Sequence, residues 1–386
     1  MNFSLRYALS AAAVIAVAAG CTPDDGSKEL ELGRALYEPM RDQKNDETLK
    51  KAEKFFEKSA ALAPENVDAL VYLARVRLDL GMVDGAREAI GRAAALAGGD
   101  VDVRLVQAQV AWVAKDYPAA AKLFGGIAGD AALSPEVRAQ GWTGLGIVEM
   151  ANGKPDVART AFLRATRLSG REASAWYHLG CLYRDAFAYQ EAALEQFEKF
   201  VYLEDPKSTR VQKTLRSTIP GIKDAIARAT AARPGVDKRD SSASANEITK
   251  AVAAWKKNDF RTARQRYQAA LALDPLSYPA ALGLAEAWQK TDATASGQRK
   301  ALESYKQACA LRPGAVKTFL AAGALAARIG MHAQAVEIYS RAVAASPTSL
   351  DALDGLVRAL RRVGGRTEDA QAYQGYRDSI TAARKK

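Results

Sequence analysis

The feature that most constrains the fold is a short pattern that returns every 34 to 38 residues over most of the chain. An alanine is followed, four residues later, by a large apolar residue, at Ala52/Phe56, Ala86/Ile90, Ala120/Phe124, Ala158/Phe162, Ala193/Phe197, Ala263/Tyr267, Ala301/Tyr305 and Ala335/Tyr339. Residues four positions apart lie on one face of an α-helix. A period of this length is typical of helical repeat arrays, in which each unit buries its apolar face only against its neighbours.

A second regularity marks where helices end. In four repeats a proline follows the large apolar residue by eight positions, at Pro64, Pro275, Pro313 and Pro347. Proline lacks a backbone N–H and clashes with the preceding turn, so it stops the helix that carries the pattern. Another helical segment precedes each alanine, and the clearest one runs from Trp176 to Tyr183. Each repeat therefore predicts two helices joined by a short turn.

This segment, WYHLGCLY, resembles the W-x2-L-G-x2-Y opening of a tetratricopeptide repeat, and Trp142, Leu145 and Gly146 repeat its first three elements. The resemblance extends over nearly all of the chain after residue 32. It implies an all-α fold of stacked helix hairpins, an α-solenoid superhelix with a concave groove that binds other proteins. The composition agrees, because alanine dominates the apolar residues and favours helices over strands.

The resemblance also assigns roles within a hairpin. Small residues of the first helix, such as Gly146, Gly180 and Gly323, are expected to let the second helix approach closely, opposite the alanines. The aromatic residues of the pattern are expected to fill the space between one hairpin and the next.

The repeats predict two blocks. The first block covers residues 33–207 with about five repeats, and the second covers 244–386 with about four. Their boundaries are 33–66, 67–100, 101–138, 139–172, 173–207, 244–277, 278–315, 316–349 and 350–386. The first and last repeats are degenerate, as terminal repeats usually are, and Pro39 interrupts the opening helix of the first.

Residues 208–243 are predicted to connect the blocks. The pattern from Arg210 to Ala232 is helical, and Pro220-Gly221 is expected to divide it into two short helices. Residues 233–243 have the composition of a linker. This arrangement favours two hinged blocks, and the alternative is one continuous solenoid in which the connecting helices stack as an aberrant repeat.

The N-terminus has the features of an export signal. Arg6 precedes an uncharged run from Ala8 to Ala19, which is too short to span a bilayer of about 30 Å. The run ends in Ala-Ala-Gly-Cys21, which resembles a bacterial lipobox. The resemblance implies a signal peptide over 1–20, lipidation of Cys21 and a polar tether over 21–32.

We therefore expect an exported, lipid-anchored protein of the outer membrane that faces the periplasm. Thr22 supports the outer membrane by resemblance, because an aspartate after the cysteine would retain the protein in the inner membrane. Cleavage by the ordinary signal peptidase, which would leave a soluble periplasmic protein, is the alternative.

Charge is divided unevenly along the chain. Residues 1–206 have 24 basic and 29 acidic side chains, residues 207–240 have 9 and 3, and residues 241–386 have 22 and 12. The first block is therefore mildly acidic and the second strongly basic. Such an asymmetry concerns partners more than fold.

The basic residues of the second block fall on a regular stripe. By resemblance, the first helix of each hairpin forms the inner face, and each of these four helices ends in a base: Lys256, Lys290, Arg328 and Arg362. Trp255, Arg358 and Arg361 lie beside them. A helix macrodipole alone favours bases at a C-terminus. Asp79 and Asp185 occupy the same location in the first block, however, so the stripe is predicted to bind an acidic partner.

The inner face of the first block is predicted to be more apolar and mixed, and it could hold an extended peptide. Its members are Val71, Arg75, Leu78, Thr143, Ile147, Met150, Tyr177, Cys181 and Arg184. Tyr177 and Arg184 are the partner-binding candidates among them.

Nothing in the sequence indicates catalysis, a metal or a cofactor. The two histidines, His178 and His332, lie in different blocks and outside any metal-binding spacing. Cys181 and Cys309 are interpreted as small buried hydrophobic residues. We expect no enzyme, because no segment outside the repeats is long enough for a catalytic domain.

The sequence favours a scaffold of the bacterial cell envelope that binds a protein or peptide partner, and a small-molecule substrate is not evident. A pilotin-like assembly lipoprotein for a pilus or secretion system is a narrower alternative. A binder of an anionic envelope polymer is another, suggested by the basic second block. Nucleic acid is not an expected partner, because that block lacks an aromatic platform apart from Trp255.

Overall fold

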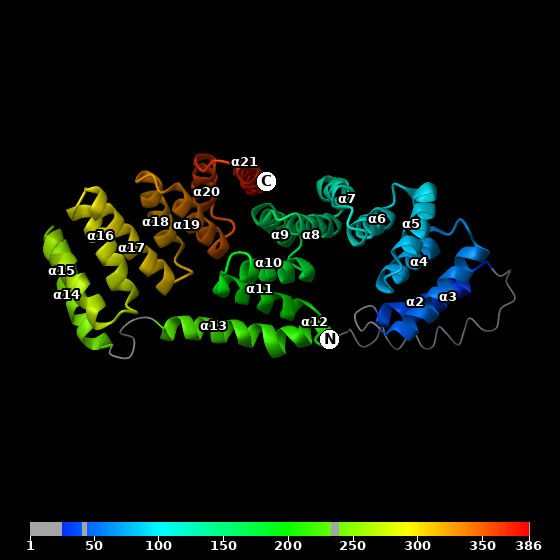
Figure 1. Cartoon of the computed structure of the whole chain (residues 1–386), viewed down its shortest axis with the longest axis horizontal. Coiled ribbons are helices and arrows are strands. Elements are labelled where there is room, and N and C mark those ends of the chain that lie inside the picture. Colours follow the sequence, from blue (N-terminus) through cyan, green and yellow to red (C-terminus); the bar gives the residue numbers. More distant parts are fainter. Residues whose placement is uncertain (1–24, 41–44, 233–238, 386) are drawn as a thin grey trace. The chain divides into compact units, whose positions relative to one another are not determined.

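The computed structural model describes residues 25–40, 45–232 and 239–385, and every regular element among them is helical (Figure 1). The predicted all-α fold of helix pairs is therefore confirmed. The signal peptide, Cys21 and residues 233–238 of the predicted linker lie outside the described residues.

The described residues form two compact units. Unit 1 comprises the residues up to Lys154 together with Arg164–Trp176 and Phe200–Thr214. Unit 2 comprises Pro155–Leu163, Tyr177–Lys199 and the residues from Leu215 onward. The units therefore divide the chain differently from the two predicted blocks, because parts of residues 155–199 group with the C-terminal repeats.

Unit 1 is built from consecutive helix pairs, and several helices contribute residues to both units. The helices are α2 (Ser27–Met40), α3 (Asp46–Leu62), α4 (Val67–Asp79), α5 (Val83–Ala97), α6 (Val101–Val113), α7 (Tyr117–Gly129), α8 (Pro135–Ala151), α9 (Pro155–Leu168), α10 (Ala173–Asp185), α11 (Gln190–Leu203) and α12 (Thr209–Lys213). Helix α2 begins at Ser27, so residues 27–32 belong to the first helix pair and not to the predicted tether. Helix α8 begins four residues before the predicted boundary at 139, because Ser134 caps its N-terminus and Pro135 starts it.

The chain continues with a π-helical turn and nine further α-helices in the described residues of unit 2. They are η2 (Thr214–Thr218), α13 (Ile219–Ala231), α14 (Ser241–Lys256), α15 (Phe260–Leu273), α16 (Tyr278–Thr291), α17 (Ala295–Leu311), α18 (Val316–Arg328), α19 (His332–Ala345), α20 (Leu350–Arg362) and α21 (Thr367–Arg384). In Figure 1, α14 lies beside α15 and α16 beside α17, as their contacts also show.

Two predictions about the connecting segment need correction. Pro220 stands in the first turn of α13, where a missing N–H costs nothing, and a π-helical turn precedes it instead of a break at Pro220-Gly221. Residues 241–243 are not linker, because the Asp240 side chain accepts a hydrogen bond from the Ala243 N–H and starts α14 there.

The turns inside several hairpins share a backbone requirement. The residue before the N-cap of the second helix has a positive φ at Gly81 (77°), Gly153 (72°) and Gly330 (80°). Glycine adopts this conformation without steric cost. Lys115 (62°) and Asn258 (59°) hold the same place in two other hairpins, where Asp116 and Asp259 cap the helix that follows.

The repeating pattern forms the core. All eight alanines and their large apolar partners are buried. The glycines of the first helices face the aromatic rings more closely than the alanines: a Cβ on Gly323 would lie 2.8 Å from the Tyr339 ring, and one on Gly144 would lie 2.3 Å from the Phe124 ring. At Gly180 and Gly323 the space that a side chain would fill is therefore taken by the rings of Phe197 and Tyr339, which corrects the expectation that these two glycines lie opposite the alanines.

Unit 2 contains a buried polar network that joins α9 to α19 and α21. Arg159 is 0% exposed and donates to Asp156 Oδ1 (2.9 Å), to Ser340 Oγ (3.1 Å) and to the Tyr373 hydroxyl. Its guanidinium also lies 4.4 Å from the centroid of the Phe187 ring. Arg366 donates to the second oxygen of Asp156 at 2.5 Å. We call these residues, with Ser340, the Arg159 network.

Candidate functional site

Unit 1 contains a groove of about 530 Å³, which we call the unit 1 groove. Most of its wall comes from α4, α6, α8 and α10, the first helices of successive hairpins. The lining residues are Arg75, Asp102, Leu105, Gln109, Trp112, Phe124, Gln140, Thr143, Gly144, Ile147, Glu172 and Ser174. Arg75, Thr143 and Ile147 belong to the inner face predicted for the first block.

The groove presents both polar and apolar contacts. Arg75 and Asp102 form an ion pair across neighbouring helices at 2.7 Å. The Trp112 ring lies 5.3 Å from that of Tyr117, which fixes one face of the indole. Gln109 and Gln140 each offer an amide that can both donate and accept hydrogen bonds. Such a surface suits a ligand that carries alternating donors and acceptors.

Glu172 stands at the edge of the groove in a partly dehydrated position. Burial raises the pKa of its carboxyl above the usual 4.5, a hydrogen bond with Thr143 opposes this rise, and the nearby charge of Glu204 adds to it. The groove therefore keeps a carboxyl group that forms no ion pair with another described residue.

Two other arginines of unit 1 form ion pairs with neighbouring helices or turns. Arg77 pairs with Glu53 at 3.0 Å and also with Glu57, and Arg104 pairs with Asp130 at 3.1 Å. Hydrogen bonding with Arg104 lowers the pKa of Asp130. These charges hold neighbouring helices together and are not free for a ligand.

The predicted basic stripe of unit 2 is exposed to solvent, and its members differ in their contacts. Lys256, Lys290 and Arg328 each lie at the end of a different helix. The Lys290 ammonium is 5.9 Å from the centroid of the Phe260 ring, and Arg328 donates to the Gln298 side chain at 2.9 Å. Trp255 is half-buried against Phe260, with ring centroids 5.0 Å apart.

Three members of the stripe meet in one place. Arg358, Arg361 and Arg362 line a hollow of about 450 Å³, together with Ala327, His332, Tyr339, Gly355 and Ala359. We call it the arginine hollow. Lys256, Lys290 and Arg328 do not line it, so the stripe predicted from helix register divides into a cluster and three separate bases.

Tyr177 and Arg184, the candidates from the first block, belong to unit 2. The Tyr177 ring packs edge-on against Phe197 with centroids 5.8 Å apart. Arg184 makes two hydrogen bonds with Asp185, at 2.6 and 2.7 Å, and lies over the same Phe197 ring. Both side chains are engaged within the fold, and their predicted role in binding a partner stays a prediction.

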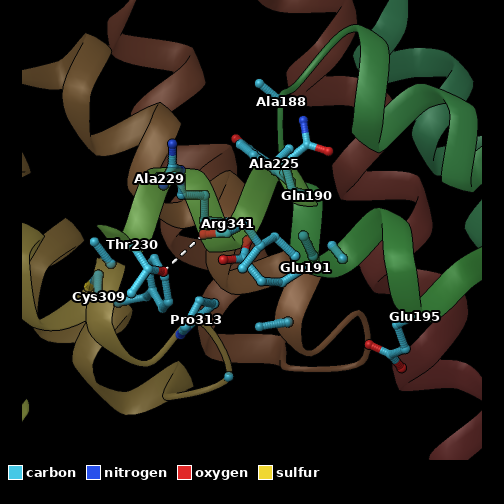
Figure 2. A pocket seen from close by; sticks show the side chains of 18 residues that line it. Ala188, Gln190, Glu191, Glu195, Ala225, Ala229, Thr230, Cys309, Pro313 and Arg341 are labelled. Carbon is cyan, nitrogen blue, oxygen red and sulfur yellow. Dashed lines mark hydrogen bonds between the residues drawn. The ribbon is translucent and has the colours of Figure 1, made fainter. Parts of the chain in front are cut away.

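A third cavity, of about 330 Å³, lies within unit 2. Figure 2 shows side chains from α11, α13, α19 and the α17–α18 turn converging on it. Its wall is mostly small and apolar, with Arg341 and Glu191 among its charged members. Arg341 pairs with Glu337 at 3.4 Å and lies 5.1 Å from the Tyr189 ring centroid, so its charge is already engaged.

Cys181 and Cys309 form no disulfide within the described residues. Cys309 is buried in the wall of this third cavity, as predicted, and burial raises the pKa of its thiol to about 12. A thiol with this pKa is protonated at neutral pH and is a poor nucleophile. Cys181 is only half-buried, which corrects its interpretation as a core residue.

Two features are absent from the described residues. No group of three or more His, Cys, Asp or Glu side chains among them is placed to hold a metal ion. Nor does any helix within residues 25–40, 45–232 and 239–385 combine the length and hydropathy needed to cross a bilayer.

Sequence reasoning missed most of the polar wall of the unit 1 groove. Gln109 and Trp112 follow Leu105 at helical spacing on α6, and Gln140 precedes Thr143 on α8. Extending the same inner-face register into residues 101–113 would have found the first two. His332 was set aside because it has no metal-binding spacing, although it lines the arginine hollow.

The comparisons with known proteins agree with the fold. Models of the tetratricopeptide repeat match residues 46–110, and residues 143–208 with 248–296. None of the curated proteins matches the sequence.

Several solved structures are similar. One, from a functional characterization of Pseudomonas aeruginosa PilF, has 19% identity and a TM-score of 0.40, and the match covers 54% of this chain and 94% of that one. A crystal structure of MamA has 18% identity, a TM-score of 0.33 and coverages of 49% and 96%. The Cut9–Hcn1 hetero-tetramer of the APC/C has 15% identity, a TM-score of 0.34 and coverages of 92% and 79%.

Proposed function

Because the chain is a tetratricopeptide repeat protein, we propose that it is a non-catalytic adaptor of the bacterial cell envelope that holds an extended peptide segment of a partner protein in the unit 1 groove. Proteins of this repeat family bind proteins or peptides, and the fold is typical of interaction scaffolds. The observation that carries the proposal is that the first helices of four successive hairpins line a single groove with polar side chains and a tryptophan.

The chemistry of the groove suits a peptide backbone. An extended peptide has unpaired N–H and C=O groups along its length, and each must be satisfied when it leaves water. Gln109 and Gln140 can each donate to a carbonyl and accept from an N–H. Trp112 adds a flat apolar surface for a side chain of the peptide.

Photo-crosslinking tests this proposal. A photoreactive amino acid at Gln109 should capture a discrete protein from intact cells, whereas the same amino acid at the exposed Glu88 of α5 should not. Replacing Gln140 by alanine should reduce capture from position 109. The proposal is wrong if positions 88 and 109 capture the same proteins with equal yield.

The location in the envelope is part of the proposal and is supported by the sequence that ends in Cys21. Labelled palmitate should be incorporated into the wild-type protein and not into Cys21→Ser. Equal labelling of both would remove the lipid anchor, and the protein would then be a candidate for the soluble periplasmic alternative. A pilotin-like role in assembling a pilus or secretion system is a narrower form of the same adaptor.

A second candidate function concerns the basic stripe of unit 2. Lys256, Arg358 and Arg362 are exposed and form no ion pair with another described residue, which favours an acidic protein segment or an anionic envelope polymer as ligand. Salt-sensitive retention on a polyanion column, without a discrete protein partner, would favour this candidate over the adaptor.

A further inference from the structure

The arginine hollow has an unusual charge balance for this chain. Arg358, Arg361 and Arg362 are all exposed, and none of them forms an ion pair within the described residues. Arg361 donates only to the neutral amide of Gln374, at 3.5 Å. Two other arginines nearby are ion-paired: Arg366, in the turn between α20 and α21, with Asp156 and Asp369, and Arg377 of α21 with Asp354. Arg384, the last residue of α21, donates to the Thr348 carbonyl. Three guanidinium groups thus share one hollow without a counter-ion.

One ring nitrogen of a histidine that lines the same hollow also lacks a hydrogen-bond partner among the described residues. The Nδ1 atom of His332 is buried and has no hydrogen-bond partner among the described residues. His332 is the first residue of α19, and no side chain caps that N-terminus, so the partial positive charge of the helix end adds to that of the arginines. A buried polar atom without a partner is costly, so this histidine is held beside the hollow at a cost in stability.

The floor of the hollow is held in place by close packing. A Cβ on Gly355 would lie 2.3 Å from the Tyr339 ring, and one on Gly323 would lie 2.8 Å from it. The ring is therefore fixed between α18 and α20, and the arginines project from a rigid surface. A rigid surface beneath the arginines lowers the conformational entropy that ligand binding costs.

The helix macrodipole is the competing explanation, because bases at a helix C-terminus are favourable without a ligand. It accounts for arginines on the last turns of α20. It does not account for a hollow between them, nor for the unpartnered nitrogen of His332 on a different helix.

We infer that the arginine hollow binds a phosphate monoester group. Such a group has a charge near −2 and three oxygens that accept hydrogen bonds. One guanidinium fork already satisfies a planar carboxylate, so three forks provide more donors than a carboxylate can use. The inference goes beyond the adaptor proposal, which concerns the unit 1 groove, and narrows the second candidate for the stripe to one chemical group.

The probe is phenyl phosphate, titrated calorimetrically into the full chain at about pH 7.5, where a phosphate monoester is mostly dianionic. Benzoate serves as the matched carboxylate. We expect saturable binding of phenyl phosphate that is at least about fivefold tighter than that of benzoate, because more charged hydrogen bonds form. Absence of saturable binding, or equal affinities for the two probes, would overturn the inference.

Variants locate the site. Replacing Arg358, Arg361 and Arg362 by glutamine should weaken phenyl phosphate binding at least about tenfold. The control replaces Arg228, Arg261 and Arg299, three exposed arginines of unit 2 outside the hollow, and should change it less than about twofold. An equal loss in both triple variants would show diffuse charge and no site. His332→Phe should weaken binding without changing the helix content, and unchanged binding would remove the histidine from the site.

A final arm distinguishes where the phosphate group resides. Phosphatidic acid carries a phosphate monoester at a lipid surface, and phosphatidylcholine vesicles provide the control. Retention of the full chain on phosphatidic acid vesicles, lost in the hollow's triple variant, would support a lipid ligand. Binding of phenyl phosphate without such retention would support a soluble or protein-borne phosphate. The crosslinking at Gln109 is independent of all these measurements, so the two proposals can fail separately.

Discussion

The Arg159 network and the arginine hollow show the same side chain in two settings within unit 2. Arg159 is fully buried and has Asp156, Ser340 and Tyr373 as partners. Burial raises the pKa of Tyr373 well above its usual value, so this hydroxyl keeps its proton and donates to Asp156 at 2.7 Å. The arginines of the hollow are exposed and have no carboxylate partner among the described residues.

The comparison distinguishes a charged side chain that holds the fold together from charged side chains that are available to bind a ligand. A buried guanidinium persists only if its donors are satisfied, because the desolvation cost is otherwise too large. An exposed cluster of like charges at a helix C-terminus gains little from folding, because mutual repulsion offsets the favourable interaction with the helix macrodipole. Substitutions in the two regions should therefore differ sharply in their effect on stability.

The largest effect is expected for Arg159→Ala. It leaves the Asp156 carboxylate buried with fewer donors and opens a cavity beside Phe187, so the free energy of unfolding should fall by about 3–5 kcal/mol. Urea denaturation measures this loss, and hydrogen exchange should locate it in α9, α19 and α21. Arg341→Ala, on α19 but exposed and paired only with Glu337, is the control and should cost less than about 1 kcal/mol. Similar losses for Arg159 and Arg341 would contradict the distinction between the two settings.

Two glycines of unit 1 provide a comparison of buried and open surroundings that does not involve charge. Gly144→Ala should lower the free energy of unfolding by about 1–3 kcal/mol, because the new methyl group overlaps the Phe124 ring. Gly125→Ala, in α7 with no atom beyond its chain neighbours and its own helix backbone within 4 Å of the new Cβ, should instead raise it by about 0.4–1 kcal/mol. Thermal unfolding measures the change in stability of both variants. If Gly144→Ala raised the stability as Gly125→Ala is expected to, the space around Gly144 would not be filled.

Glu172 offers a smaller test, because its carboxyl group forms no ion pair with another described residue. Burial raises the pKa of its carboxyl in the folded state, so the folded protein binds a proton more tightly than the unfolded chain. Its contribution to stability should therefore decrease as the pH rises from about 4.5, the usual value, through the folded-state pKa, and stay low above it.

Glu172→Gln should remove this decrease, so the variant should be more stable than the wild type at pH 7 and show a flatter stability profile above about pH 4.5. The exposed Glu65→Gln is the control and should leave the profile unchanged. A Glu172→Gln profile that still falls with pH would assign the decrease to other groups.

The sequence predicted the repeating part of the fold because that part is local. An alanine and an aromatic residue four positions apart lie on one helix face, and a proline two positions beyond the last helical residue ends the helix at Pro64, Pro275 and Pro313. The Arg159 network was not predictable in this way. Asp156 and Tyr373 are separated by 217 positions, and neither belongs to a motif that points to the other.

The candidate sites were predicted only as far as helix register could reach. Register placed Arg358, Arg361 and Arg362 on one stripe, and the structure brings these three into one hollow. Register could not show that Arg184 would pair with Asp185, the next residue in the chain. Nor could it show that Tyr177 would pack against Phe197, because both outcomes depend on side-chain conformations and not on which helix face a residue occupies.

The smallest effect on stability is expected where the effect on ligand binding is largest. In the triple variant of Arg358, Arg361 and Arg362 to glutamine, each exposed arginine loses up to about 0.3–1 kcal/mol of interaction with the C-terminus of α20. The loss is offset because three like charges within five residues no longer repel one another. The net change in the free energy of unfolding should therefore stay within about 1 kcal/mol, and high salt should reduce it further, since exposed charges are screened. Urea denaturation at low and high salt measures both. A salt-independent loss above about 3 kcal/mol would show that these arginines hold the fold together as Arg159 does, and the distinction between the two regions would then be wrong.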